Sequence, residues 1–398
     1  MKKLYLLLLL FEFSNSQPIT WTQKADFPTN GRAWAVSFSI GDKGYVGTGG
    51  QNSIYHNDLW EYNPVNDTWT QKANLPAQSR TGAIGVSTST KGYIGLGSVS
   101  QLYNDFWEYD PNTNMWTQKS NFPGSGRKHA TSFSINDKIY VGTGGSQSTI
   151  GNETNEFWEY DPASDSWIQK ADFPGIGRSR AVGFSIAGKG YIGPGYHFDS
   201  QNPVWPKDMW EYNPSNDLWT KKPNYPGSGN TDCVHFSIGN FGYVGMGYLN
   251  NLDFWKFDPQ NNSWTPLTSF PGNSRIAQTS CAIGNKGYLG LGYKVISGTS
   301  IYFTDFWEMC DSALSIDENT INTSDIVIYP NPIKDNINFR INDPSIQIEL
   351  VKIYDINGRL IHQYKNSEQL SINNISSGNY FLKISINKGT LTKKIIKI

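Results

Sequence analysis

The chain is poor in cysteine, in charge and in long apolar runs, and each shortage excludes a class of protein. Three cysteines among 398 residues are too few for a disulfide scaffold or a cysteine-rich zinc module. Charged residues make up 17% of the chain and the formal net charge is −1, which gives no overall electrostatic case for nucleic acid or an anionic membrane as a partner. The five histidines show no paired metal-ligand spacing, so we expect no metal, no cofactor and no catalytic residue.

Glycine, proline and aromatic residues are abundant instead. The chain holds 39 glycines and 20 prolines, and 14% of its residues are aromatic, including 14 tryptophans and 22 tyrosines. Aromatic side chains favour pleated surfaces, whereas glycine and proline mark turns. This composition predicts an all-β protein, and the length favours two domains.

The N-terminus is typical of an export signal. Lys2 and Lys3 form a positive start, residues 4–11 form a short apolar run, and small residues at 14–16 offer a cleavage site. The apolar run is too short to span a bilayer, and no stretch of 18 apolar residues follows it. We therefore expect residues 1–16 to be a signal peptide and the mature chain to be soluble, extracytoplasmic and without a transmembrane segment.

An internal repeat dominates the rest of the sequence. A hydrophobic residue followed by tryptophan, usually with an acid next, recurs six times, and a second tryptophan follows nine residues later in five copies. The first tryptophans are Trp60, Trp107, Trp158, Trp210, Trp255 and Trp307, and the second are Trp69, Trp116, Trp167, Trp219 and Trp264. Each copy also carries a glycine-rich strand upstream and a proline turn between the tryptophans.

Each repeat accommodates four short strands, which in the first copy are residues 35–40, 43–47, 58–62 and 68–72. Four strands in about 50 residues is the arithmetic of a propeller blade. The sixth copy has Ile316 where the second tryptophan is expected, while an unmatched fourth strand with Trp21 lies at residues 20–24. We therefore predict a six-bladed propeller over residues 17–311, closed by its own N-terminal strand, which removes an exposed sheet edge.

These repeats resemble kelch repeats. The resemblance rests on the glycine doublets at 49–50 and 144–145, the Trp-Glu-Tyr segments and the spaced second tryptophan. Four copies depart from the kelch pattern, because the second glycine of the doublet is replaced by Ser98, Tyr196, Tyr248 or Tyr293. These departures do not change the number of strands predicted for each repeat.

The C-terminal segment has a different character, and we place a linker at 312–324 and a second domain at 325–398. Its motifs are IYPNP at 328–332, DINGR at 355–359, SGNYF at 377–381 and the basic KKIIK at 393–397. In this order they resemble a type IX secretion sorting domain, which implies a small β-sandwich that directs export across the outer membrane. The alternative is an ordinary β-sandwich adhesion module. The resemblance implies the type IX secretion machinery as a partner, and a secreted or outer-cell-surface location.

Candidate ligand-binding residues gather where the first strand of each blade begins. That end of the blade also carries the link from strand two to strand three, which differs widely among the copies. Five copies place an arginine before the first strand and the fifth copy an asparagine: Arg32, Arg80, Arg127, Arg178, Asn230 and Arg275. Two residues later every copy differs, and the polar or aromatic members there are Trp34, His129, Arg180 and Asp232.

Two interpretations of these residues remain open. The arginines could ring the mouth of the central channel and attract an anion, with the variable layer providing selectivity. Alternatively, each arginine bridges carbonyl and acidic groups of the blades, because a feature repeated in every blade usually serves the blade. Likewise, the variable links could carry specificity or simply drift.

We therefore predict a non-catalytic extracellular binding protein that recognises an anionic protein or glycan ligand through the arginine-bearing face. The competing hypothesis is enzymatic, since the kelch resemblance extends to secreted mutarotases of sialic acid. Cys233 and His235 suggest a copper site of the kind found in some propeller oxidases, but we interpret them as packing residues.

Overall fold

The structure is a computed structural model that describes residues 19–311 and 326–398, apart from 146–151, 200–201, 230, 249–250, 343, 356–358, 366–368 and 388. The chain divides into two compact units, Met1–Asp311 and Ser312–Ile398. The predicted signal peptide at 1–16 and linker at 312–324 lie outside the described residues. Within the described ranges, no helix is long and apolar enough to cross a membrane.

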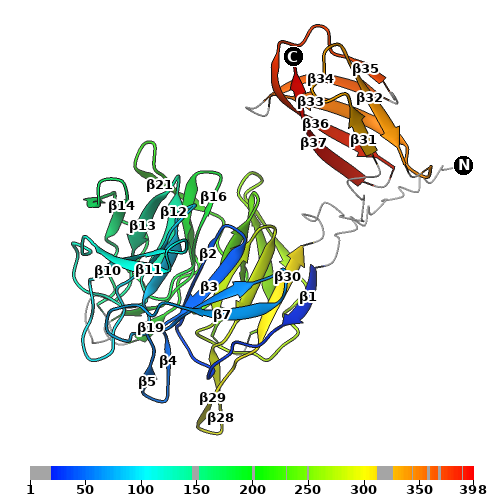
Figure 1. Ribbon diagram of the computed structural model, residues 1–398. Helices are drawn as coiled ribbons and strands as arrows, with labels where there is room; N and C mark the ends of the chain where they lie inside the picture. Colours follow the sequence, from blue (N-terminus) through cyan, green and yellow to red (C-terminus); the bar gives the residue numbers. More distant parts are fainter. Residues whose placement is uncertain are drawn as a thin grey trace, which may run out of the picture. The chain divides into compact units, whose positions relative to one another are not determined.

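The first unit is a propeller in which the described residues form six four-stranded antiparallel sheets (Figure 1). Blade one contains β2 (Val36–Ile40), β3 (Lys43–Gly47), β6 (Leu59–Asn63) and β7 (Thr68–Lys72). Blade two contains β8 (Ile84–Ser87), β9 (Gly92–Gly95), β10 (Phe106–Asp110) and β11 (Met115–Lys119). Blade three contains β12 (Thr131–Ile135), β13 (Lys138–Gly142), β14 (Phe157–Asp161) and β15 (Ser166–Gln169).

The other three blades repeat this order. Blade four contains β16 (Gly183–Ile186), β17 (Lys189–Ile192), β20 (Met209–Asn213) and β21 (Leu218–Lys222). Blade five contains β22 (Val234–Ile238), β23 (Phe241–Gly245), β24 (Phe254–Asp258) and β25 (Ser263–Leu267). Blade six contains β26 (Thr279–Ile283), β27 (Lys286–Gly290), β30 (Phe306–Asp311) and, from the other end of the unit, β1 (Ile19–Lys24).

The ring of blades is closed, as the sequence predicted. The innermost strands contact one another in the order β2, β8, β12, β16, β22, β26 and back to β2. Strand β1 pairs antiparallel with β30, so that Trp21 lies opposite Met309 and Gln23 opposite Trp307. The N-terminal strand therefore supplies the missing fourth strand of the last blade.

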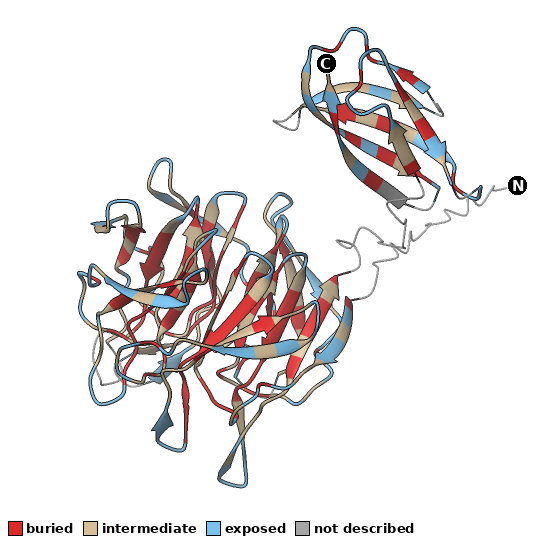
Figure 2. Cartoon of the chain, in the orientation of Figure 1, coloured by how far each residue is buried: buried red, intermediate tan, exposed pale blue. Residues whose placement is uncertain are grey.

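Burial falls from the axis to the rim of the propeller. Strand β3 is buried over four of its five residues, whereas three of the five residues of the outer strand β7 are exposed (Figure 2). Aromatic side chains fill the space between blades, as where Tyr62 of blade one meets Tyr288 and Phe306 of blade six at 5.6 and 5.0 Å between ring centroids. These contacts explain the aromatic content of the sequence, since flat sheets stack radially only when large side chains fill the widening gap.

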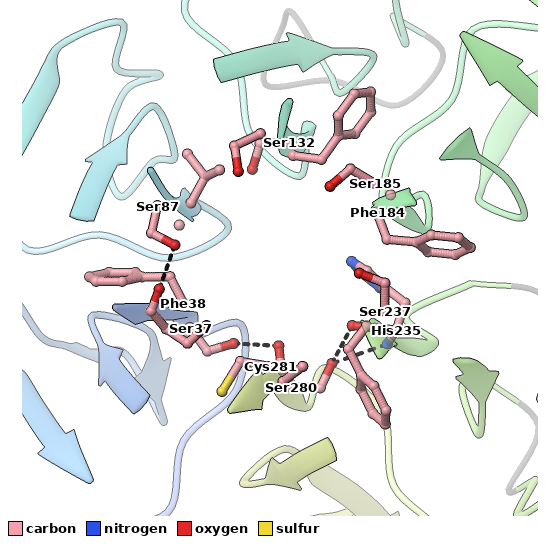
Figure 3. Close-up of a pocket in the computed structure, with 18 of the residues that line it drawn as sticks. Ser37, Phe38, Ser87, Ser132, Phe184, Ser185, His235, Ser237, Ser280 and Cys281 are labelled. Carbon is pink, nitrogen blue, oxygen red and sulfur yellow. Dashed lines mark hydrogen bonds between the residues drawn. The ribbon is translucent and has the colours of Figure 1, made fainter. Parts of the chain in front are cut away.

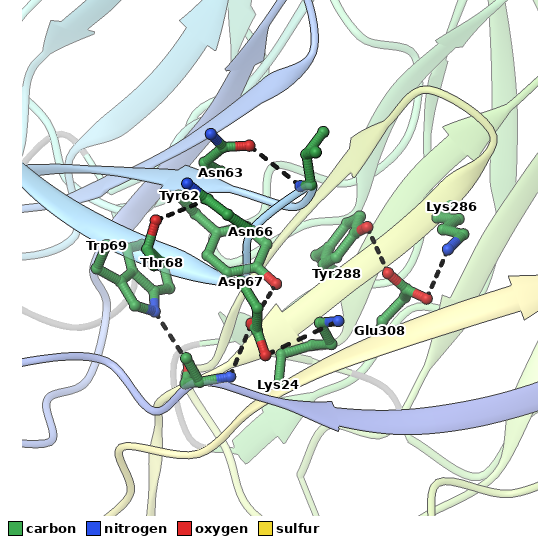
Figure 4. Close-up of polar contacts among 12 residues, drawn as sticks. Lys24, Tyr62, Asn63, Asn66, Asp67, Thr68, Trp69, Lys286, Tyr288 and Glu308 are labelled. Carbon is green, nitrogen blue, oxygen red and sulfur yellow. Dashed lines mark hydrogen bonds and ion pairs between the residues drawn. The ribbon is translucent and has the colours of Figure 1, made fainter.

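The second tryptophan of the repeat links neighbouring blades at the rim. In each blade its indole nitrogen donates a hydrogen bond to a carbonyl just beyond the outer strand of the preceding blade. The six donors are Trp21, Trp69, Trp116, Trp167, Trp219 and Trp264, at 2.8–3.4 Å. At the seam, Trp69 donates to the carbonyl of Ala25, and the Asp67 carboxylate accepts from the Ala25 amide at 2.9 Å and the Tyr62 hydroxyl at 2.7 Å (Figure 4). The closing strand is thus fastened by the same indole hydrogen bond as every other blade.

Three of the variable links form small hairpins that project from one face of the propeller (Figure 1). They are β4 (Gly50–Gln51) with β5 (Ile54–Tyr55), β18 (His197–Asp199) with β19 (Asn202–Val204), and β28 (Tyr293–Ile296) with β29 (Thr299–Tyr302). We call this side of the propeller the hairpin face. The innermost strand of each blade begins at the same face.

The second unit is a β-sandwich. One sheet contains β31 (Ile326–Tyr329), β32 (Asn336–Ile341) and β35 (Gln369–Ser371). The other contains β34 (Leu360–Lys365), β33 (Ile348–Tyr354), β36 (Gly378–Ile386) and β37 (Gly389–Lys397). Its core is almost entirely aliphatic, with Ile337, Val351 and Leu382 fully buried, whereas the propeller core combines aliphatic side chains with many aromatic ones.

Candidate functional site

The five repeated arginines are buried inside their blades. Arg32, Arg80, Arg127 and Arg178 are 0% exposed and Arg275 is 1% exposed. Each guanidinium pairs with an acid that directly precedes the third strand and donates to a carbonyl beyond the second strand. Arg80, for example, reaches both oxygens of Asp105 at 2.6 and 2.7 Å and the carbonyl of Leu96 at 3.0 Å.

The same arrangement recurs in the other arginine-bearing blades. The acids are Asp58, Asp105, Glu156, Asp208 and Asp305. An aromatic ring also lies under each guanidinium, such as Phe122 at 4.7 Å from Arg127. Because these guanidiniums are buried and each is paired with an acid of its own blade, the structure favours the interpretation in which Arg32, Arg80, Arg127, Arg178 and Arg275 serve the blade. That they bind ligand stays a prediction.

The fifth blade lacks the pair, and Asn230, its candidate ligand-binding residue, lies outside the described residues. The acid is still present as Asp253, which accepts hydrogen bonds from the Ser228 amide at 2.9 Å and hydroxyl at 3.2 Å. Another donor thus replaces arginine at this acid.

The variable layer two residues further on forms a backbone ring around the propeller axis, which we call the mouth ring. Its six members are Trp34, Gly82, His129, Arg180, Asp232 and Ala277, all with φ between 50° and 62°. Four of the six consecutive pairs are hydrogen-bonded through the backbone: the Trp34 amide donates to the Ala277 carbonyl at 3.0 Å, Gly82 to Trp34 at 3.4 Å, and His129 to Gly82 at 2.7 Å. The Arg180 amide continues the ring by donating to His129 at 2.9 Å.

The left-handed backbone of the mouth ring carries a free-energy cost that depends on which residue occupies each position. Glycine takes this conformation without penalty, whereas any other residue pays about 1 kcal/mol or more. Only Gly82 uses the favourable residue, and a Cβ there would come within 2.8 Å of the His129 ring. Trp34, His129, Arg180 and Asp232 occupy four of the other five positions despite this cost, and Ala277 occupies the fifth.

These four side chains contact one another across blades. The Trp34 indole nitrogen donates to Asp232 Oδ1 at 3.1 Å, and Arg180 Nη1 lies 3.4 Å from Asp232 Oδ2. The Arg180 guanidinium lies over the Trp34 ring at 5.5 Å, and the His129 ring meets Trp34 edge-on at 5.5 Å. The Asp232 side chain is 3% exposed and that of Arg180 is 33% exposed. The structure thus brings together all four variable residues that the sequence singled out.

The charges of the mouth ring are internally balanced. Arg180 is paired with Asp232, and His129 is neutral at pH 7 because burial, followed by the charges of Arg180 and Lys128, holds its pKa well below the usual 6.5. With the repeated arginines neutralised in the blades, the mouth has no unpaired cation among these residues. The expectation of an anion-attracting funnel therefore loses its physical basis.

Tyrosines missed as candidates in the sequence surround the mouth ring. Tyr293 meets Trp34 at 5.6 Å, and the Tyr196 ring lies 5.8 Å from the Arg180 guanidinium. Trp205 contacts both Tyr196 and Tyr248, each at 6.3 Å between ring centroids. Tyr196, Tyr248 and Tyr293 are the residues that replace the second kelch glycine, so this departure from the repeat was the available signal.

Below the mouth ring the innermost strands enclose a central channel of about 390 Å³. Figure 3 shows serines and His235 around an open centre, with Phe38 and Phe184 pointing away from it. Several serines bridge neighbouring blades, as where the Ser37 hydroxyl donates to the Ser280 carbonyl at 2.8 Å. His235 Nδ1 lies 3.1 Å from the Cys233 carbonyl, and burial lowers the pKa of His235.

Cys233 and Cys281 are buried, and Cys310 is partly buried. All three cysteines are free, and Cys233 is 6% exposed with its thiol directed to the Met246 carbonyl at 3.6 Å. In the described parts of the chain, no group of three or more histidine, cysteine, aspartate or glutamate residues could hold a metal ion. Cys233 packs in a hydrophobic cluster between blades four and five, whereas His235 lines the channel.

Comparisons with known proteins agree with both units. Residues 327–398 match the secretion system C-terminal sorting domain family, and residues 48–76 match the Kelch motif. No curated protein matches the chain. Among solved structures, the structure of YjhT has a TM-score of 0.59 at 16% sequence identity, covering 71% of this chain and 95% of that chain. Because 775 chains of solved structures match, the likeness establishes the fold and does not select a function.

The first unit is thus a kelch-type β-propeller, and the second is a secretion sorting domain. The sorting domain indicates export through type IX secretion, to the cell surface or beyond it, and makes the secretion machinery a partner. Together the two units define an exported protein with a kelch-type propeller.

Proposed function

We propose that this protein binds an extracellular protein or glycan at its hairpin face, with the mouth ring at the centre of the site, and that it catalyses no reaction. The observation that carries the proposal is the cluster of Trp34, His129, Arg180 and Asp232. Four interacting side chains are held at backbone positions where glycine would be more favourable. No feature of the repeat requires them.

The surroundings of the mouth ring support a binding role. Tryptophan, tyrosine and arginine are the residues that contribute most to binding energy at interfaces. The links around the mouth also expose large apolar side chains, including Ile54 at 56%, Val295 at 59% and Tyr248 at 42%. An exported protein with such a surface has an apolar contact area and a few oriented polar groups, which together give affinity and specificity.

The test is a binding screen with the mature chain, residues 17–398, on an array that displays extracellular proteins and glycans. A ligand found there is measured again with a variant that combines Trp34→Ala, His129→Ala and Arg180→Ala. We expect at least a hundredfold loss of affinity, because three contacts near the centre of an interface are removed. Ala277→Gly, at the remaining small position of the ring, is the matched control. Undiminished binding by the triple variant contradicts the proposed site.

An alternative enzymatic function as a sialic acid mutarotase would need a group at the mouth that can exchange a proton. Asp232 Oδ1 accepts a hydrogen bond from the Trp34 indole, and Oδ2 is paired with the Arg180 guanidinium. His129 is neutral because its pKa is lowered. A neutral His129 is not charged to donate a proton near neutral pH. An NMR assay of sialic acid anomerisation decides the matter, since a rate enhancement that disappears in Asp232→Asn would refute the proposal of binding without catalysis.

A further inference from the structure

We infer that the ligand of the hairpin face is an uncharged oligosaccharide, whose sugar rings lie along a row of aromatic side chains that crosses the mouth. This inference rests on the proposed function and names its ligand class. The row contains Tyr302, Tyr293, Trp34, Tyr196, Trp205 and Tyr248, with Arg180 between Trp34 and Tyr196.

The row is continuous. Tyr302 stacks on Tyr293 at 5.5 Å, and Tyr293 meets Trp34 at 5.6 Å. The Arg180 guanidinium then joins the two halves, since it lies 5.5 Å from the Trp34 ring and 5.8 Å from the Tyr196 ring. Beyond Arg180, Tyr196 contacts Trp205, and Trp205 lies nearly parallel to Tyr248, with 13° between the ring planes. No break separates the hairpin of blade six from the links of blades four and five.

The row is confined to one side of the mouth. Blades six, one, four and five supply its members, whereas blades two and three have Gly82, Ser98, His129 and Gly145 at the corresponding positions. The kelch glycine is replaced by tyrosine in blades four, five and six, which are the blades flanking this side. A linear arrangement suits a chain-like ligand better than a compact one.

The chemistry of the row matches that of a sugar. The C–H faces of a sugar ring are apolar and stack on aromatic rings, while its hydroxyls need donors and acceptors at the edges. Tyrosine and tryptophan offer an apolar face and a polar tip in one side chain. Tyr248 is 42% exposed, and Trp34, Tyr196, Trp205, Tyr293 and Tyr302 are partly exposed.

The charges at the centre of the row favour a neutral ligand. An anion attracted to Arg180 would also meet the carboxylate of Asp232, which is 3.4 Å from the same guanidinium. A cation would meet Arg180 in turn. Sugar hydroxyls, in contrast, can accept from the partly exposed guanidinium of Arg180 without disturbing its pair with the buried carboxylate.

The experiment uses the mature chain on an array with neutral, sialylated and sulfated oligosaccharides, followed by calorimetry with the strongest neutral one. We expect neutral oligosaccharides to bind, with less than a twofold change in affinity between about 50 and 500 mM salt, because no charge pair forms with the ligand. Trp205→Ala and Tyr248→Ala should each weaken binding about tenfold. Thermal melting of each variant shows whether it is folded, and Tyr248→Ala, at the exposed end of the row, tests the row even if Trp205→Ala fails to fold.

Tyr55→Ala is the matched control, because Tyr55 is an exposed tyrosine on hairpin β4–β5 outside the row. It should leave affinity unchanged. Binding restricted to sialylated or sulfated sugars overturns the inference, as does an equal loss in Tyr55→Ala. If the array of the preceding section yields a protein ligand that needs the mouth and no sugar binds, this inference fails while the proposed function stands. If neither class binds, both fail.

Discussion

Two layers of the propeller, only two residues apart in each repeat, behave in opposite ways. The arginine layer is the same in five blades, buried, and paired with an acid of its own blade. The mouth ring differs in every blade, is partly exposed at Trp34, His129 and Arg180, and forms polar contacts between blades, as between Trp34 and Asp232. From this difference we infer that a residue type repeated in every blade stabilises the blade. A position where the residue type differs from blade to blade, although the backbone is the same, is a better candidate for binding.

The largest expected effect on stability comes from removing β1, the strand that closes the ring of blades containing both layers. Deleting residues 17–26 removes β1, the outer strand of blade six, and with it the rim contacts of Trp21 and Ala25. The open edge of β30 and the unfilled gap to blade one should make the propeller melt well below the intact protein and expose it to proteases. Differential scanning calorimetry and limited trypsin digestion measure this. A truncated protein that melts no earlier would contradict the latch.

The arginine layer provides the next effect. Arg80→Met leaves the Asp105 carboxylate without its ion pair in a largely buried site, so unfolding free energy should fall by about 3–5 kcal/mol. Chemical denaturation measures the change. Arg80→Met combined with Asp105→Asn should recover part of the loss, because the uncompensated charge is removed. A loss below about 1 kcal/mol for Arg80→Met would mean that the pair is not structural.

These two predictions test features that the sequence revealed to different degrees. The missing tryptophan of the sixth repeat and the surplus Trp21 predicted the closure, because a propeller with an open edge is physically unfavourable. The acid that pairs with each arginine also recurs, directly before the third strand, but its role depended on a turn of the chain that brings residues 80 and 105 together.

The contacts of the mouth ring were beyond the reach of sequence reasoning. Trp34 and Asp232 are separated by 198 residues, and their hydrogen bond exists only because the ring closes. The positive φ of the ring residues was equally hidden, since tryptophan, arginine and histidine do not suggest a left-handed backbone. The sequence showed that the residue types of this layer differ from blade to blade. The contacts among their side chains, and their positive φ, could be found only in the structure.

Lowering the pH should have a smaller effect on the free energy of unfolding, and this effect should come from the mouth ring and not from the arginine layer. His129 has a pKa well below 6.5 in the folded protein, so the unfolded chain takes up a proton first as the pH falls below 6.5. This contribution to stability is therefore fully present above pH 6.5 and is lost at up to about 1.4 kcal/mol per pH unit below it. Burial raises the pKa of Asp105, but hydrogen bonding to Arg80 brings it below its usual value, so Asp105 stays ionised in this range.

The measurement compares denaturation of the wild type and His129→Asn between pH 7 and 5. Asparagine tolerates the left-handed backbone and does not titrate. The variant should lose less stability than the wild type over this range, while His56 and His235, whose pKa values are also lowered, supply a common background. Identical pH dependence of the two proteins would show that His129 is protonated as readily in the fold as in the unfolded chain.

The smallest effect on stability is expected where the effect on binding is largest. Replacing a mouth-ring residue with glycine relieves the left-handed strain, which offsets the greater entropy of the unfolded chain, so Ala277→Gly should change unfolding free energy by less than about 1 kcal/mol. The double variant Arg180→Gly/Asp232→Asn removes both charges of the pair, so no uncompensated carboxylate is left at the buried position 232 and the cost should stay at about 1 kcal/mol. Denaturation measures both variants, and ligand affinity should fall only for the double variant. A loss of several kcal/mol in the double variant, comparable to that of Arg80→Met, would erase the distinction between the layers, because it would make the mouth ring as much a part of the blade as the buried arginines.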